Sequence, residues 1–263
     1  MPILNLASNL RLHYLDENPN GKPAVLLLHG LCATGASWHF QFPALTDAGF
    51  RVIAPDARGF GQSSYPGKLS IAEMAHDFAR VIESLQIAPA HVVGISMGGT
   101  IALQLALDHP RLVSKLALVN TFAHLQVRGI SELAYYALRL GLVHTVGLPA
   151  QARTVIKRIF PKPDQAELRR ALYDQILQAN PSAYRAVMRA FTSFNVMNRL
   201  NTLRAPTLVV TGDADTTVRL ENQCALAQGI PGSRHEIIRG AGHAVTVDSP
   251  DAFNQILLEF LRA

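Results

Sequence analysis

The chain has 263 residues, of which 49% are hydrophobic and 16% are charged, and its formal net charge is +5. This composition is typical of a globular protein with a sizeable core, and no apolar run approaches the ~18 residues that a membrane span requires. The N-terminus lacks the basic start and apolar centre of a signal peptide, so we expect an uncleaved, cytoplasmic protein without a membrane partner.

The excess positive charge is confined to one segment of the sequence. Residues 151–204 carry ten Lys/Arg against three Asp/Glu, whereas residues 1–150 carry ten against nine and residues 205–263 carry four against seven. The basic segment lacks the interleaved aromatic residues of an RNA-binding surface, so no nucleic-acid partner is expected. Two interpretations stay open, namely solvated helix faces and a positive field that favours anionic substrates.

Predicted strands and helices alternate along most of the chain. Residues 3–8 and 10–16 are predicted to form two strands joined by a polar turn. The apolar runs at residues 24–30 and 50–56 resemble strands buried on both faces of a sheet, and further strands are predicted at residues 91–96, 116–121, 206–213 and 234–240. Helical periodicity lies between several of these runs, at residues 70–85, 97–108 and 251–261. This order predicts an α/β fold whose mostly parallel sheet is covered by helices on both faces.

Residues 122–204 interrupt the alternation with a long helical segment that contains no predicted strand. An insertion between two strands of one sheet is expected to lie above the strand ends. We therefore expect a core domain made of residues 1–121 and 205–263, with residues 122–204 as a helical cap or lid. An exposed face of this cap could also serve as the surface of a homodimer.

Ser96 lies where a predicted strand turns sharply into a predicted helix, within the motif Gly94-Ile95-Ser96-Met97-Gly98. Such a turn strains the backbone of the turning residue, and glycines two positions before and after it make room for the close approach of neighbouring backbone. The hydroxyl is then exposed at the strand end, as a nucleophile requires. The alternative is a serine that only caps the helix.

A serine needs a base, and the base needs an acid that orients it. His243 is the strongest candidate base, because it lies in a glycine-bracketed loop between the last strand and the last helix. His39 and His124 also follow strands, although neither lies between glycines. For the acid we favour Asp215, which lies further beyond its strand than Asp213, and we assign Asp213 to a turn.

Two backbone amides are candidates for an oxyanion hole. Met97 follows Ser96 at the start of the helix, and Leu31 follows His29 and Gly30 at the end of an earlier strand. We expect His29 to hold this loop rather than to act as a base. The two cysteines, Cys32 and Cys224, have the spacing of neither a disulfide framework nor a metal site, so no metal is expected.

With these motifs in order, the chain resembles an α/β-hydrolase over nearly its full length. The matching stretches are "HG" at 29–30, "DARGFGQSS" at 56–64, "GISMGG" at 94–99, and "GDAD" at 212–215 with "GAGH" at 240–243. The resemblance implies a structural turn that contains Arg58 and Gly59 and is held by Asp56. It also implies a proline three residues after the acid, where this chain has Val218.

The resemblance implies a cofactor-free serine hydrolase (a carboxylesterase) acting on a small-molecule ester or lactone. Alternatives within the family are an enol-lactonase, a carbon–carbon bond hydrolase of ring-cleavage products and a cofactor-free haloperoxidase; a small-molecule receptor on the same fold is the non-enzyme alternative. Trp38 could border the substrate pocket or pack behind it. The residues expected to line the pocket are Trp38, Phe122, Leu125, Tyr135, Leu138, Phe160 and Val218.

Overall fold

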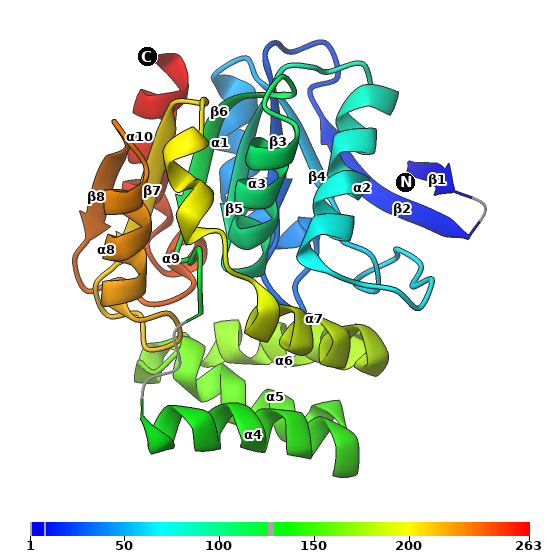
Figure 1. The fold of residues 1–263 in the computed structure, drawn as a ribbon, viewed down its shortest axis with the longest axis vertical. Coiled ribbons are helices and arrows are strands. Elements are labelled where there is room, and N and C mark those ends of the chain that lie inside the picture. The colour runs from blue at the N-terminus through cyan, green and yellow to red at the C-terminus, as the bar shows by residue number, and fades with distance from the viewer. Residues whose placement is uncertain (1, 8, 126–128) are drawn as a thin grey trace.

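The computed structural model describes residues 2–7, 9–125 and 129–263, and within them one eight-stranded sheet forms the centre of the molecule (Figure 1). Its strand order is β1-β2-β4-β3-β5-β6-β7-β8. The β1–β2 and β2–β4 pairs are antiparallel and every later pair is parallel, which confirms the predicted α/β fold. The strands are β1 Ile3–Ala7, β2 Leu10–Glu17, β3 Ala24–Leu28, β4 Arg51–Pro55, β5 Ala90–Ile95, β6 Val113–Val119, β7 Thr207–Gly212 and β8 Arg234–Ile238.

Helices cover both faces of this sheet, so the hydrophobic core has two layers. One layer packs the sheet against helices that include α2 (Ile71–Ser84), α3 (Met97–Asp108) and α8 (Leu220–Gly229). The other packs it against α1 (Gln41–Asp47) and α10 (Pro250–Arg262). Because β3, β5 and β7 are buried at every residue, their continuous apolar sequence matches a position between two helical layers.

Four α-helices of the predicted cap lie together below the sheet in Figure 1. These cap helices are α4 (Ile130–Thr145), α5 (Leu148–Ile159), α6 (Ala166–Gln178) and α7 (Pro181–Ser193). A single antiparallel bridge joins His124 to Asn195 near the two ends of the insertion. In the described part of the chain, no helix combines the length and the apolar character needed to cross a membrane.

Short helical segments complete the connections between these elements. The 3₁₀ helices are η1 (Gly35–Trp38), η2 (Pro163–Gln165) and η3 (Met197–Thr202), and α9 (Val245–Asp248) follows the last strand. The η1 segment and α9 both contribute residues to the cavity described below.

The turn after β4 forms a buried polar cluster around Asp56. Its carboxylate accepts hydrogen bonds from the backbone amides of Gly35 (2.8 Å) and Gln62 (2.9 Å), and it lies 2.8 Å from His13 Nδ1. The Gly59 carbonyl of the same turn accepts a hydrogen bond from the Asn180 amide at the start of α7, over 3.2 Å. The turn therefore connects the core to the cap.

Candidate active site

Ser96 lies at the joint between β5 and α3 with φ +53° and ψ −114°, a strained conformation for a residue with a side chain. A Cβ atom at Gly94 would overlap the Gly98 carbonyl oxygen, and one at Gly98 would overlap that of Leu28. The Ser96 side chain makes no helix-capping hydrogen bond, so the capping alternative does not describe it. The glycines thus permit a turn that leaves the hydroxyl on a cavity wall.

His243 and Asp215 form a buried pair at the carboxyl end of the sheet. His243 Nδ1 lies 2.9 Å from Asp215 Oδ2, and the two side chains are 8% and 1% exposed. Because an ionised carboxylate only accepts hydrogen bonds, this contact places the imidazole proton on Nδ1 and leaves Nε2 as the nitrogen that can accept one. Ser96 and His243 line the same cavity.

The Asp215 carboxylate is held by the loop that carries it. Its Oδ1 accepts hydrogen bonds from the backbone amides of Thr217 (2.7 Å) and Val218 (3.0 Å). A proline at the position of Val218 would have no amide proton to donate, so this departure from the family pattern adds a contact. Asp213 has a different partner, since its Oδ1 accepts from the Gly240 amide at 2.6 Å.

Asn120 connects the loops that carry the acid and the base, and no sequence motif predicted this role. Its Nδ2 donates to the carbonyl oxygens of Gly242 (2.8 Å) and His243 (2.7 Å), and its Oδ1 accepts from the Gly212 amide at 2.8 Å. The residue is fully buried and has φ +43°, a conformation that asparagine tolerates better than most residues. Its position directly after β6, where the strand ends at the active-site edge of the sheet, was the one sequence feature that could have indicated this role.

The loop after β3 carries Leu31 into the cavity and is braced by His29. The His29 Nδ1 donates to the Gly30 carbonyl (2.7 Å), and its Nε2 accepts from the Ala57 amide (2.9 Å). Burial lowers the pKa of His29, which is consistent with the neutral form that these two contacts require. Leu31 lines the cavity, and Met97 is the first residue of α3.

The structure places five of the seven expected pocket residues on the cavity wall, namely Phe122, Leu125, Tyr135, Phe160 and Val218. The expectation for Leu138 was wrong, and of the two alternatives for Trp38 the structure shows the one in which it packs behind the cavity. Trp38 is 1% exposed and packs against Phe253, with ring centroids 6.4 Å apart, in the core layer on the α10 side of the sheet. Leu138 is 51% exposed, on the side of α4 that faces away from the cavity.

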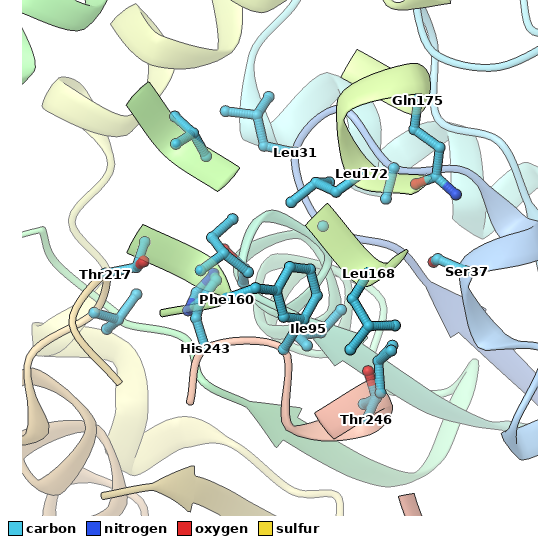
Figure 2. Close-up of a pocket in the computed structure, with 18 of the residues that line it drawn as sticks. Leu31, Ser37, Ile95, Phe160, Leu168, Leu172, Gln175, Thr217, His243 and Thr246 are labelled. Atoms are coloured by element: carbon cyan, nitrogen blue, oxygen red, sulfur yellow. The ribbon is translucent and has the colours of Figure 1, made fainter. Parts of the chain in front are cut away.

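The cap supplies cavity residues that sequence reasoning missed. In Figure 2, Leu168 and Leu172 approach the same cavity as His243 and the predicted Phe160. Arg139 also lines the cavity, although it lies outside the basic segment 151–204, and no Lys or Arg of that segment is among the described lining residues. Which side of each cap helix faces inward depends on how four helices pack together, and helical periodicity alone does not fix this.

The other suspected histidines occupy different places. His39 is exposed at the cavity edge, beside the Phe40 ring, and His124 forms the bridge to Asn195. Among the described residues, no group of three or more His, Cys, Asp or Glu side chains is arranged to hold a metal ion. Burial raises the pKa of the Cys32 thiol to about 12, so this cysteine is not suited to act as a nucleophile.

Comparison with known proteins identifies the family. A family model described as the alpha/beta hydrolase fold matches residues 23–250, so the chain belongs to the α/β-hydrolase family. It is 33% identical over 257 residues to a protein of Variovorax paradoxus (strain S110) named "Putative carbamate hydrolase RutD", and the alignment covers 95% of this chain and 96% of that protein.

Two solved structures are similar over almost their whole length. The enol-lactonase from Burkholderia xenovorans LB400 has a TM-score of 0.90 and 26% identity, with 100% of both chains covered. A thermophilic esterase from Thermogutta terrifontis has a TM-score of 0.86 and 28% identity, with 99% of this chain and 97% of that chain covered. The fold and these relatives together support a hydrolase.

Proposed function

We propose that this chain is a serine hydrolase that cleaves small carboxylic esters through an acyl-enzyme. The observation that carries the proposal is the arrangement of three side chains: Ser96 on its strained turn and His243 both line one cavity, and Asp215 holds His243 Nδ1 at 2.9 Å. This leaves His243 Nε2 to accept the proton of the serine hydroxyl, as a general base does.

The proposed reaction has two halves. Ser96 Oγ attacks the ester carbonyl while its proton passes to His243, and the backbone amides of Leu31 and Met97 stabilise the negative oxygen of the tetrahedral intermediate. His243 then protonates the departing alcohol, which leaves an acyl group on Ser96. Water, deprotonated by His243, releases the acid and restores the serine.

A lactone is the second candidate substrate, because its carbonyl would meet the same groups. The similarity to the enol-lactonase from Burkholderia xenovorans LB400 over the whole of both chains favours it. The lactone ring would open on acylation, and the alcohol would remain attached to the acyl group. The carbamate named for the Variovorax paradoxus relative contains the same kind of carbonyl centre.

The experiment that tests the proposal is a substrate panel with two enzymes. We would measure turnover of 4-nitrophenyl acetate and butyrate, simple lactones, an enol-lactone and a carbamate ester by wild type and by Ser96→Ala. Wild type should prefer one of these classes, and the variant should lose about 10⁴-fold or more in kcat, as loss of a triad nucleophile does. If Ser96→Ala kept the wild-type rate on every hydrolysed substrate, Ser96 would not be the nucleophile.

A further inference from the structure

Arg139 places a buried positive charge at the wall of the reaction cavity. It lies on α4, is 7% exposed and lines the same cavity as Ser96 and His243. Among the described side chains of α4, those of Tyr135 and Tyr136 line the cavity together with Arg139. A guanidinium in such a site is costly to bury unless an anion compensates it.

Within the described residues, no carboxylate forms an ion pair with Arg139. Its Nε and Nη2 donate to the Tyr184 hydroxyl oxygen, over 3.2 and 2.9 Å, and Nη1 makes no hydrogen bond to these residues. Arg58 offers a comparison, because it is similarly buried (8% exposed) but donates two hydrogen bonds of 2.6 Å to the carboxylate of Asp77. Arg139 has the same burial without the acid.

The guanidinium is nevertheless held in a fixed position. It lies over the rings of Tyr135 and Tyr184, at 5.6 and 5.9 Å from their centroids. The Tyr184 hydroxyl oxygen also accepts a 2.7 Å hydrogen bond from Gln151 Nε2 on α5. Burial opposes the charge, but the nearby tyrosines favour it and the pKa of Arg139 is raised, so the side chain stays cationic.

The positive charge is also close to the loop that carries Leu31. Cys32 follows Leu31 in sequence, and the charge of Arg139 acts on its thiol, in the direction opposite to that of burial. Because Ser96 and Arg139 line the same cavity, one ligand can present its reacting carbonyl to the Ser96 hydroxyl and an anionic group to the guanidinium.

We propose that Arg139 binds a carboxylate group of the acyl substrate, so that the preferred esters or lactones carry a second, unreacted carboxylate. This inference rests on the proposed function, since it names the substrate class of the same site. The carboxylate would complete the charge pairing of Arg139 with charge-assisted hydrogen bonds and would orient the carbonyl toward Ser96.

A different role for Arg139 would be to stabilise the oxyanion through its field, because it is close to the Leu31 loop. That role would affect charged and neutral substrates alike. The carboxylate-binding role affects only those substrates that carry the second anion, so matched substrates distinguish the two.

The test uses 4-nitrophenyl monoesters of succinate and glutarate beside the same compounds with the free carboxylate capped as a methyl ester. Wild type should prefer a charged ester over its capped form in kcat/KM by about 10-fold or more, as a hydrogen-bonded charge pair supplies. Arg139→Gln should reduce this ratio about 10-fold or more, chiefly through KM. Arg153→Gln, an exposed arginine of α5 that does not line the cavity, is the matched control and should keep the wild-type ratio.

Two results would overturn the proposal. One is a charged-to-capped ratio that Arg139→Gln leaves as in wild type, and the other is an equal loss for charged and capped esters, which is the result for an oxyanion role. If Arg139→Gln does not fold, the proposal is tested instead by measuring whether free glutarate inhibits wild type. Competitive inhibition by glutarate that its uncharged diamide does not reproduce supports the proposal, and no inhibition contradicts it.

Failure of the proposed function would be recognised separately. If wild type hydrolysed no ester or lactone, the hydrolase proposal would fail, whereas calorimetric binding of glutarate to wild type and to Arg139→Gln would still test the anion site. If wild type hydrolysed neutral esters through Ser96 and showed no preference for charged ones, the hydrolase proposal would stand and the carboxylate inference would fail.

Discussion

His91 shows how burial of one side chain makes the stability of the whole fold depend on pH. It belongs to β5, and its Nδ1 lies 2.7 Å from the Ser114 hydroxyl oxygen. Burial, together with the charge of Lys115, lowers the pKa of His91 to about 4. An unfolded chain would give this histidine a pKa of about 6.5, so between these values the unfolded state binds the proton more readily.

The sign of the effect follows from this difference. The contribution of His91 to the free energy of unfolding is fully present above about pH 6.5. It is lost as the pH decreases toward 4, because protonation of His91 favours the unfolded chain. We predict that the free energy of unfolding in urea decreases from pH 7 to pH 5, and that His91→Asn makes this decrease smaller.

His29 and His235 also have lowered pKa values, so a part of the pH dependence should remain in that variant. His144→Asn is the control, since His144 is exposed on α4, and it should behave as wild type does. If the free energy of unfolding of His91→Asn decreased with pH as steeply as that of wild type, His91 would not be a source of this pH dependence.

At the scale of elements, the joint between β5 and α3 depends on a close approach to β3. A Cβ at Gly98 would overlap the Leu28 carbonyl, and it would also lie 2.7 Å from the carbonyl oxygen of His29. We predict that Gly98→Ala destabilises the protein by about 3 kcal/mol or more, because backbone on both sides of the contact would have to move. Thermal or urea unfolding measures the change.

Gly141→Ala is the matched control for this prediction. Gly141 is also helical, within α4, but nothing lies within 4 Å of the place where its Cβ would be. Alanine should therefore raise stability by about 0.5 to 1 kcal/mol through its higher helix propensity. Equal destabilisation by the two alanines would refute the steric explanation.

The end of α5 links the cap to the loops of the acid and the base. The Arg158 guanidinium donates to the Thr216 carbonyl, next to Asp215, and lies 4.2 Å from the centroid of the Tyr135 ring. Lys162, just beyond α5, donates from Nζ to the Gly240 carbonyl at 3.1 Å. One segment of the cap thus contacts both loops.

We predict that Arg158→Gln loosens this attachment and raises KM for the hydrolysed ester about 3- to 10-fold, with a smaller change in kcat. The reason is that the cap forms much of the cavity wall, whereas the His243–Asp215 pair has its own backbone contacts. Steady-state kinetics on the preferred ester measure the changes in KM and kcat separately. An effect confined to kcat would contradict this account, and Arg153→Gln again serves as the control.

At the scale of the whole molecule, the sequence predicted the sheet more completely than the cap. Buried parallel strands have almost continuous apolar sequences, so β3, β5 and β7 could be recognised along the chain without knowledge of their neighbours. The Ser96 turn was equally recognisable, because its glycines meet a local steric requirement.

The cap residues could not be assigned in the same way. Leu138 and Arg139 are adjacent on α4, yet the leucine is exposed and the arginine is buried at the cavity, the reverse of what their polarity suggests. The orientation of Arg139 follows from its hydrogen bonds to Tyr184 on α7, whose hydroxyl oxygen also accepts a hydrogen bond from Gln151 on α5, and both partners lie far along the chain. Asn120 likewise acquires its role only when three loops meet.

The central claim is that Ser96 is the nucleophile of a serine hydrolase, and covalent labelling tests it most directly. We would treat wild type and Ser96→Ala with diethyl 4-nitrophenyl phosphate, follow 4-nitrophenolate release, and locate the adduct by peptide mass spectrometry. The account predicts one equivalent of release and one diethylphosphoryl group on Ser96 in wild type, with neither in the variant. An adduct on another residue, or wild-type esterase activity that survives the reagent with Ser96 unlabelled, would contradict it.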